Sequence, residues 1–220
     1  RCRQTAYSKG SSRMTSQHES AVTAGLVTLA PPPTPQELAV LHARLLEGAQ
    51  LAGLVDVAYR TLDTPVGVLL LAATPAGLVR VAYEREGTDA VLGELATRVS
   101  PRILEAPGRL DITARQLEEY FARRRRHFEV PLDMTLSSGF RRMVLGYLPN
   151  IAYGHTASYG AVAAAVDNPK AVRAVGTACA TNPLPLVIPC HRVIRSDGVT
   201  GAYRGGAEAK RQLLRLEAAG

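Results

Sequence analysis

Residues 168–217 read NPKAVRAVGTACATNPLPLVIPCHRVIRSDGVTGAYRGGAEAKRQLLRLE and hold the most specific pattern of the chain. Near the centre, an apolar run at 186–188 is stopped by Pro189, and Cys190 and His191 follow side by side. This order predicts a short buried segment that leads into a turn or short helix, where a thiol can meet both a base and a ligand. Two interpretations are open for these residues alone. Most free cysteines are buried and inert, whereas a cysteine beside a base can be an activated nucleophile.

Two short helices are predicted ahead of this pattern. The first covers 137–151 and begins with two serines, either of which can cap it. The second covers 156–166, with Thr156 or Ser158 as its cap.

A third helix is predicted to start with Asn168 as N-cap and Pro169 at the first helical position. A tight turn between two short helices, the second basic at its start, is typical of a helix-turn-helix, although many helical hairpins look alike. Small side chains along this helix favour either close helix packing or close approach to a DNA groove. They include Ala171, Ala174, Gly176, Thr177, Ala178 and Ala180.

Charge is spread unevenly along the 220 residues, whose formal net charge is +7. Residues 137–220 contain ten Lys or Arg and only four Asp or Glu. A basic half beside a nearly neutral half points to a polyanionic partner, with a merely basic surface as the alternative. No apolar stretch approaches the roughly 18 residues that a membrane span needs, so no membrane partner is expected.

The three cysteines are Cys2, Cys179 and Cys190. They are too few for a disulfide framework and lack the paired spacing of a zinc site, which favours a reducing, intracellular setting and no bound metal. The first residue is Arg, Met14 is a possible internal start, and no secretory signal is recognisable. We therefore expect a cytoplasmic protein.

The first 135 residues divide into three parts. A polar, proline-rich tail at 1–35 is predicted to be disordered. An extra helix at 36–54 follows, with Thr34 as N-cap and Pro35 at its first position. A small α+β domain is predicted at 55–135, and residues 137–220 form the last domain.

Within the α+β domain, turn residues separate three strands in hairpin succession at 57–62, 67–74 and 78–84. Helices are expected at 88–99, capped by Thr88, and at 111–126, with an edge strand at 127–134 because Pro131 disfavours a central one. The four arginines at 123–126 suit a solvated helix C-terminus, and phosphate contact is the alternative.

The motifs NPKAxRAVG, NPxPxxIPCHRV, GxYxGG and a K…LLxxE ending, taken together, closely resemble the active-site domain of the O6-alkylguanine-DNA alkyltransferases. The resemblance covers about 140–217, and the domain at 55–135 is similar, more weakly, to that family's ribonuclease-H-like N-terminal domain. It implies an α+β fold with a C-terminal helical winged helix-turn-helix domain. The residues before 55 have no counterpart.

In that family, alkyl groups pass from O6 of guanine, and also from O4 of thymine, to a cysteine of the protein itself, without a cofactor. The resemblance makes Cys190 this acceptor and implies a relay from Cys190 through an ordered water to His191 and Glu217. A buried carboxylate at Glu217 would fix the imidazole tautomer and stabilise the imidazolium as it forms.

Other roles carry over position by position. Tyr159 matches the tyrosine that helps protonate the guanine at N3, and Asn182 the asparagine that braces the active-site turn. Val193 matches the residue whose carbonyl accepts from the guanine 2-amino group, and Tyr203 with Pro185 shapes the alkyl pocket.

The resemblance also implies binding to duplex DNA that carries O6-alkylguanine, through the minor groove and as a monomer, in the nucleoid if the chain is bacterial. Arg173 matches the arginine that fills the gap left by the flipped nucleotide, and Lys170 is placed to hold phosphates. The helix residues expected against the DNA are Ala171, Ala174, Gly176 and Thr177.

Two positions depart from the family or stand apart. Arg204 occupies a place where many members have serine or glycine, so it either narrows the pocket or reaches a phosphate. Cys179 is interpreted as a small buried residue rather than a second acceptor.

Besides a single-turnover transferase, two other classes of protein are alternatives. A damage-recognition protein that binds without reacting usually lacks the acceptor cysteine, and a cysteine hydrolase would not be expected to carry a basic helix-turn-helix.

Overall fold

The computed structural model describes residues 32–218, so most of the tail predicted at 1–35 lies outside the described residues. The first helix, α2 (Pro35–Leu51), begins as predicted, with Pro35 at its first position. The hydroxyl of Thr34 accepts a hydrogen bond from the Glu37 amide at 3.2 Å, and the Glu37 carboxylate accepts one from the Thr34 amide at 2.7 Å. This reciprocal capping box satisfies two amides that the first helical turn leaves without partners.

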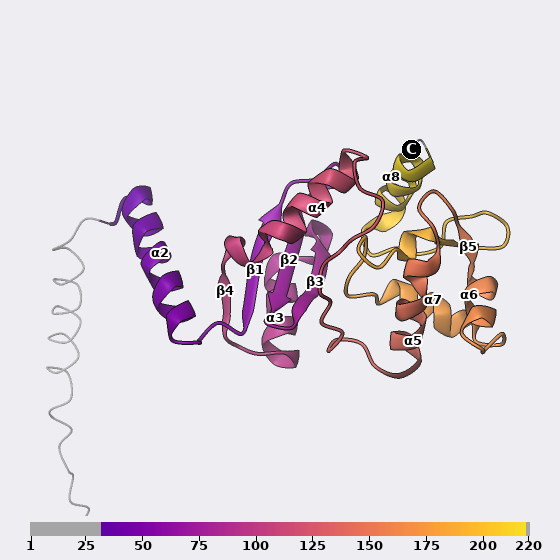
Figure 1. Cartoon of the computed structure of the whole chain (residues 1–220), viewed down its shortest axis with the longest axis horizontal. Helices are drawn as coiled ribbons and strands as arrows, with labels where there is room; N and C mark the ends of the chain where they lie inside the picture. Colours follow the sequence, from indigo (N-terminus) through magenta and orange to yellow (C-terminus); the bar gives the residue numbers. More distant parts are fainter. Residues whose placement is uncertain (1–31, 219–220) are drawn as a thin grey trace, which may run out of the picture. The chain divides into compact units, whose positions relative to one another are not determined.

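A four-stranded sheet organises the first half of the chain (Figure 1). The strands β1 (Val57–Leu62), β2 (Leu69–Thr74) and β3 (Gly77–Tyr83) pair antiparallel in succession, within two residues of the predicted bounds. A short fourth strand, β4 (Ile103–Glu105), pairs parallel with β1 and gives the order β3-β2-β1-β4. The sequence analysis missed β4, because three residues are too few to show an alternating pattern.

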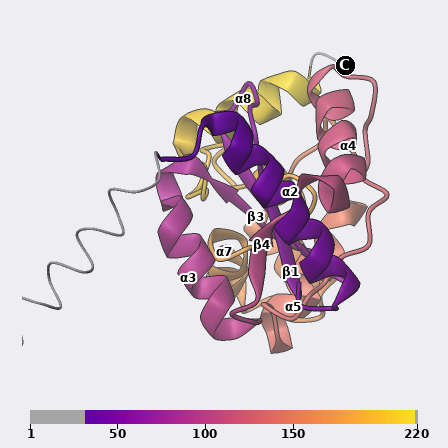
Figure 2. The same cartoon turned by 90° about the vertical axis from the view of Figure 1, so that its left-hand side faces the viewer.

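Alternating side chains of the sheet face two different helices, one on each side (Figure 2). On one face, Leu70 packs with Leu95 of α3 (Thr88–Arg98). On the other, Leu71 packs with Leu117 of α4 (Asp111–Phe121). Helix α3 starts one residue earlier than predicted, with Gly87 rather than Thr88 at the N-cap. Two 3₁₀ turns, η1 (Glu84–Glu86) and η2 (Pro107–Leu110), connect these elements.

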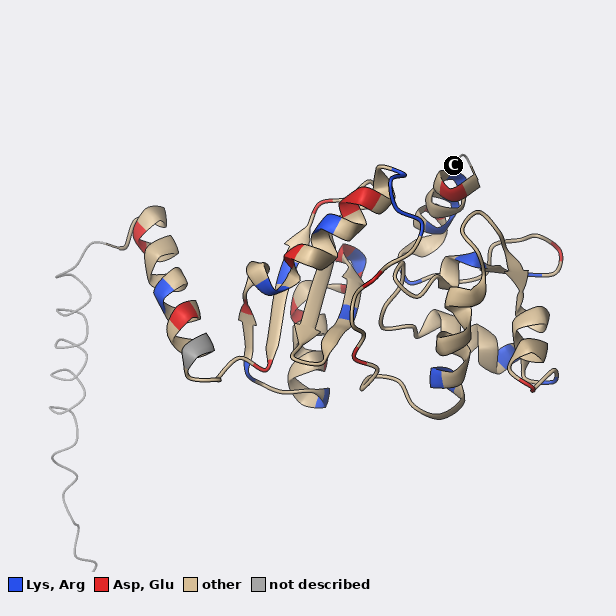
Figure 3. Ribbon diagram, in the orientation of Figure 1, with Lys and Arg blue, Asp and Glu red and all other residues tan. Residues whose placement is uncertain are grey.

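The end of this domain differs from the prediction in two ways. Helix α4 stops at Phe121, and Arg123 takes a left-handed backbone conformation with φ of 59°, so the arginines at 123–126 lie in a loop beyond the helix (Figure 3). The predicted edge strand at 127–134 is reduced to a single bridge between Leu132 and Leu78. Gly77 allows this approach, because a Cβ there would collide with the Pro131 carbonyl.

The second half is mainly helical. Its elements are α5 (Gly139–Tyr147), η3 (Leu148–Asn150), α6 (Tyr159–Ala165), α7 (Val172–Ala180), η4 (Cys190–Arg192) and α8 (Gly206–Ala218). Two residue pairs, β5 (Ala157–Ser158) and β6 (Val193–Ile194), form a small parallel sheet. Ser138 is the N-cap of α5 without a side-chain bond, and Ser158 caps α6 by accepting from the Ala161 amide at 3.0 Å.

The predicted start of the third helix is wrong by three residues: its N-cap is Ala171 rather than Asn168. Asn168 and Pro169 belong to a turn, closed by a hydrogen bond of 2.9 Å from the Ala171 amide to the Asn168 carbonyl. Proline fixes the backbone angle that the second position of such a turn requires, so the same signal fits a turn and a helix start. Helix α7 begins at Val172, which places Arg173 in its first turn rather than its second.

From Leu46 onward the described residues form one compact unit with a shared core. Buried Leu71 of the sheet, Leu117 of α4, Val175 of α7 and Leu213 of α8 belong to the same hydrophobic cluster. The sheet domain and the helical domain are therefore packed against each other in one unit. Among residues 32–218, no helix has the length and apolar character to cross a membrane.

Candidate active site

The turn that carries Cys190 is built from unusual local conformations. Leu186 is buried with a positive φ of 75°, a region that bulky residues rarely adopt. Pro189 then forms an inverse γ-turn, in which the Cys190 amide donates to the Ile188 carbonyl at 2.8 Å. Strained backbone of this kind concentrates at functional sites, because the surrounding structure must hold it in place.

Asn182 holds this turn together from inside. Its amide nitrogen donates to the Ile188 carbonyl at 2.9 Å and to the Cys190 sulfur at 3.1 Å, and its amide oxygen accepts from the Leu184 amide at 2.9 Å. The residue is fully buried. Its position is compatible with the bracing role inferred from the resemblance.

Cys190 is a protonated thiol in the resting protein. Its side chain is 1% exposed, and burial raises the pKa of the thiol to about 11, although the hydrogen bond from Asn182 to the sulfur acts in the opposite direction. Because the thiolate and not the thiol is the nucleophilic form of cysteine, any reaction at this sulfur would require a base beside it.

His191 has the protonation state of such a base. Burial lowers the pKa of its imidazole, partly offset by a hydrogen bond of 2.8 Å between Nε2 and the Glu217 carboxylate. Because the ionised carboxylate can only accept, Nε2 must carry the proton of the neutral ring. The other nitrogen, Nδ1, is buried and has no hydrogen-bond partner among the described residues, so its lone pair can accept a proton.

Glu217 is 3% exposed and lies within hydrogen-bond reach of five donors. Burial opposes its ionisation, but bonds from His191, Arg192 and Tyr120 outweigh that effect and lower the pKa of the carboxyl to about 2. Arg192 donates from Nε at 2.9 Å and from Nη2 at 3.0 Å, and the Tyr120 hydroxyl donates at 2.7 Å. The Gly154 amide adds a bond of 3.2 Å. The carboxylate is thus a fixed negative charge behind His191.

Lys210 is a second buried charge near the thiol. Its side chain is fully buried, and its ammonium group donates to the Val193 carbonyl at 2.7 Å and lies 6.0 Å from the centre of the Tyr159 ring. Burial lowers the pKa of Lys210, and the charge of a Cys190 thiolate acts in the opposite direction. Burial also raises the pKa of Tyr159, to about 12, so its hydroxyl stays protonated and available as a donor.

The loop that closes over the site rests on the sheet domain. The hydroxyls of Tyr203 and Tyr83 are 2.8 Å apart. Pro185 is buried in the segment that leads to Cys190. A Cβ at Gly205 would lie 2.6 Å from the Tyr83 ring, so the glycines of the GxYxGG motif permit this close contact. Arg204 is half-buried and pairs with Glu86 of the sheet domain at 3.4 Å.

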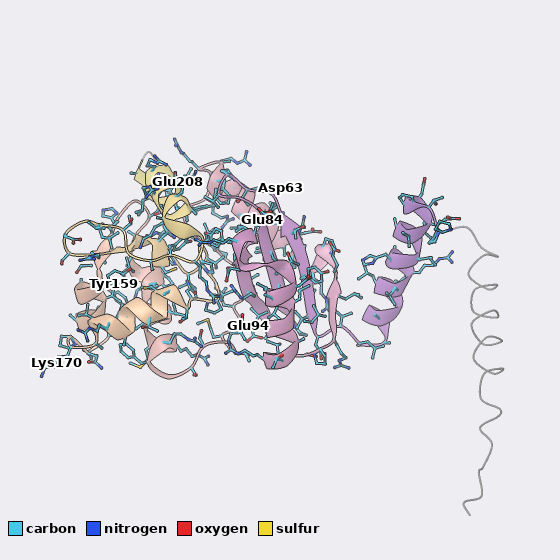
Figure 4. All side chains as sticks on the ribbon, turned by 180° about the vertical axis from the view of Figure 1, so that it is seen from behind. Asp63, Glu84, Glu94, Tyr159, Lys170 and Glu208 are labelled. Carbon is cyan, nitrogen blue, oxygen red and sulfur yellow. The ribbon has the colours of Figure 1, made fainter. Side chains whose placement is uncertain are left out.

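Helix α7 presents a face of small and basic residues to solvent. Arg173, Ala174 and Thr177 are exposed, whereas Ala171 and Gly176 are half-buried. Lys170 projects from the turn before α7 at the outer edge of the molecule (Figure 4). The opposite side of the helix is core.

Cys179 lies on that inner side of α7. It is 3% exposed and burial raises the pKa of its thiol, as expected for an inert residue. Cys2 lies outside the described residues. Among those described, no group of three or more His, Cys, Asp or Glu is arranged to hold a metal ion.

The sequence analysis missed three residues of this site: Arg192, Lys210 and Tyr120. Lys210 shares one helix face with Leu213 and Glu217, at the i, i+3, i+7 spacing of a buried stripe, and that signal could have found it. Tyr120 follows Leu117 on the buried face of α4, so its burial was predictable. Its partner, 97 residues away, was not.

Fold and site together define a class of protein: a two-domain α+β protein whose helical domain holds a buried cysteine next to a buried histidine that is hydrogen-bonded to a carboxylate. Two family models match the chain, the 6-O-methylguanine DNA methyltransferase ribonuclease-like domain at 57–134 and the DNA binding domain of the same family at 139–219. The chain therefore belongs to the 6-O-methylguanine DNA methyltransferase family, and its function is DNA repair by alkyl transfer.

Individual relatives agree with this assignment. A methylated-DNA–protein-cysteine methyltransferase of Mycolicibacterium paratuberculosis is 37% identical over 166 residues, which cover 73% of this chain and 92% of the relative. The constitutive methylated-DNA–protein-cysteine methyltransferase of Bacillus subtilis is 36% identical over 163 residues, which cover 72% of this chain and 94% of the relative. The Mycobacterium tuberculosis OGT crystallised with DNA superposes with a TM-score of 0.64 at 35% identity, covering 74% of this chain and 93% of that one. The alternative of a non-reacting damage-recognition protein is not favoured.

Proposed function

We propose that Cys190 takes the alkyl group from O6-alkylguanine, and from O4-alkylthymine, in duplex DNA, once per protein molecule. In this step the Cys190 sulfur forms a bond to the alkyl carbon while the bond from that carbon to O6 breaks. The thiol proton passes to Nδ1 of His191, through the ordered water that the family resemblance implies. The guanine anion is protonated as it leaves, so the products are an S-alkylcysteine and a normal guanine.

The observation that carries this proposal is the unpartnered Nδ1 of His191, in an imidazole whose other nitrogen is held by Glu217. A neutral imidazole in this tautomer is a competent base for a neighbouring thiol. As the proton arrives, the fixed carboxylate stabilises the imidazolium. The Cys190 thiol needs a base because burial raises its pKa to about 11, so little thiolate is present at neutral pH.

Release of the guanine uses other groups near the sulfur. The Tyr159 hydroxyl, protonated before the reaction, donates its proton toward N3 of the leaving guanine, and the proton held by His191 then returns to the tyrosinate through solvent. The Val193 carbonyl accepts from the guanine 2-amino group with its second lone pair, since Lys210 occupies only one. Tyr203 and Pro185 line the space for the alkyl group.

DNA binding is assigned to the exposed face of α7, in the minor groove, with the protein acting as a monomer and, in a bacterium, on the nucleoid. A target atom inside a stacked duplex is unreachable, so the nucleotide must be flipped out. Arg173 fills the gap that this leaves, and Lys170 holds the phosphates. The small side chains of Ala171, Ala174, Gly176 and Thr177 let the helix backbone approach the groove.

The thioether that forms is stable and nothing in the proposed chemistry removes it, so each molecule reacts once. The test is intact-mass analysis after incubation with an O6-methylguanine oligonucleotide. One methyl group should be added per protein and map to the peptide that contains Cys190. Methylation of Cys179, or repeated turnover, would contradict the proposal. The control, Cys190→Ala, should bind the methylated DNA and gain no mass.

A further inference from the structure

The sheet domain supplies one hydrogen bond to the relay of the helical domain. Tyr120 is the penultimate residue of α4, its side chain is fully buried, and its hydroxyl lies 2.7 Å from Oε1 of Glu217. The same oxygen also accepts from Nε2 of His191 at 2.8 Å and from Nη2 of Arg192 at 3.0 Å. The donors to Oε2, Nε of Arg192 and the Gly154 amide, belong to the helical domain as well. Tyr120 is thus the donor that reaches this carboxylate from across the domain boundary.

The direction of this hydrogen bond is fixed by the charges. Burial and the negative charge of Glu217 both raise the pKa of the Tyr120 hydroxyl, so it keeps its proton. Glu217 is ionised and can only accept. Tyr120 therefore donates to the same carboxylate oxygen that accepts the hydrogen bond from Nε2 of His191.

The ring of Tyr120 has little freedom to change this geometry. Its centroid lies 5.4 Å from that of Phe121, 5.3 Å from that of Phe128 and 6.1 Å from that of Tyr153. This packing fixes the direction of the Tyr120 hydroxyl, and the hydroxyl in turn restrains Oε1 of Glu217 through its hydrogen bond. Without it, Glu217 would be held only by residues of its own domain.

We infer that Tyr120 is a positioning residue for alkyl transfer. By donating to the same Oε1 of Glu217 as His191, it fixes the position of the carboxylate and limits how much of the carboxylate charge acts on the imidazole. The inference rests on the proposed function of His191 as the base. It also gives the sheet domain a direct part in the chemistry, in addition to its part in the core.

The charged and titratable groups around the imidazole determine what removal of the hydroxyl would do. His191 faces Glu217 and Lys210 on α8, Arg192 on η4, and Tyr203 on the closing loop. Of these, only Glu217 raises its basicity. Glu217 in turn faces Tyr120 and Tyr153 besides its basic partners.

Tyr120→Phe keeps the ring and deletes the shared donor. More of the carboxylate charge then acts on His191 and raises the pKa of the imidazole. Because the base works in its neutral form, activity should be lost at a higher pH than in the parent as the pH falls. At pH 8, looser positioning of the carboxylate should slow single-turnover transfer by roughly 10-fold, the scale of one hydrogen bond to a charged group.

The matched control is Tyr153→Phe. Tyr153 belongs to the same aromatic cluster, but its hydroxyl contacts the Leu216 carbonyl at 3.4 Å rather than the carboxylate. This variant should keep the parental pH profile. Replacement of Tyr120 by 3-fluorotyrosine, a stronger donor, should shift the acid limb of the profile to lower pH and thus tests the same contact with opposite sign.

Two measurements decide the role: single-turnover methyl transfer between pH 5.5 and 9, and the His191 pKa from nitrogen-15 NMR of the imidazole. Opposite shifts of the imidazole pKa in the phenylalanine and fluorotyrosine variants support the inference. An unchanged pKa in both, or a slower rate with the parental profile, overturns it and leaves Tyr120 a packing residue. If the parent transferred no methyl group, the proposed function would fail, and the NMR comparison would still decide the role of Tyr120.

Discussion

Glu217→Gln replaces the buried carboxylate by an amide of nearly the same shape, and the structure sets the size of its effect. The pKa of Glu217 is lowered from 4.5 to about 2 in the folded protein. This corresponds to about 3 kcal/mol of preferential stabilisation of the ionised form, since one pKa unit is about 1.4 kcal/mol. Removal of one member of a buried ion pair costs a similar amount, about 3–5 kcal/mol, because the partner stays buried without its counter-charge.

The partners of Glu217 explain why glutamine cannot substitute. Tyr120, His191, Arg192 and Gly154 all donate hydrogens to the two carboxylate oxygens. An amide offers one oxygen, and its NH₂ group must face other donors. The imidazole then loses the acceptor that fixes its tautomer, and the imidazolium loses its counter-charge.

We therefore expect Glu217→Gln to lose about 3 kcal/mol in the free energy of unfolding at pH 7, as measured by urea denaturation. Methyl transfer should slow by about 10²-fold or more, the usual contribution of an acid–base group. DNA affinity, measured by fluorescence anisotropy in a Cys190→Ala background, should change little. Rapid-quench kinetics with an O6-methylguanine duplex give the rate.

The stability difference should also depend on pH. The unfolded carboxyl binds a proton near pH 4.5, whereas the folded one stays ionised down to about 2. The contribution of Glu217 is thus fully present above pH 4.5 and is lost as the pH falls toward 2, so parent and variant should converge in acid.

The matched control is Glu208→Gln, on the exposed surface of the same helix, where Glu208 pairs only with Arg211 and Arg215. It should transfer methyl groups at the parental rate. Equal losses of rate and DNA affinity in Glu217→Gln would indicate a folding defect. A parental rate in that variant would refute the relay.

Three further predictions follow from the same geometry. Arg173→Ala should steeply slow transfer from methylated duplex DNA but leave reaction with free O6-benzylguanine near normal, because the exposed arginine acts on the duplex and not on the pocket; equal losses would end the arginine-finger role. The thiolate absorbance of the parent minus that of Cys190→Ala should rise only near pH 11, because burial raises the pKa of the thiol; a midpoint below pH 8 would show an activated resting thiolate instead. Arg204→Ser should raise the rate with O6-benzylguanine several-fold relative to O6-methylguanine, because it removes the side chain that spans from the closing loop to Glu86; an unchanged ratio would show that Arg204 does not limit the pocket.

Local patterns in the sequence were sufficient to place most elements. Turn residues between apolar runs located β1, β2 and β3, and the capping residue Thr34 and one of two candidates, Ser158, located two helix starts. These signals work because a strand or a helix end satisfies its own requirements within a few residues. The adjacency of Cys190 and His191 after Pro189 likewise fixed the turn, whose geometry depends on consecutive residues.

Where a segment could satisfy its backbone hydrogen bonds in two ways, the tertiary structure decided which local structure formed. Asn168 and Pro169 fit a helix start and a turn equally well, and in the structure they form a turn, with α7 beginning at Val172. Residues 127–134 have strand-like composition, yet only Leu132 bridges to β3. Pairing along a sheet edge depends on how the following chain must run, which no local pattern records.

The chemistry of the site divides in the same way. Through the family motifs, the sequence by itself predicted a nucleophile in Cys190, a base in His191 and a supporting carboxylate in Glu217 on the C-terminal helix. Only the tertiary structure decided their protonation states and the partners Tyr120, Arg192 and Lys210. A pKa depends on burial and on charges brought together from distant parts of the chain, and Tyr120 meets Glu217 only because the sheet and the helices share one core.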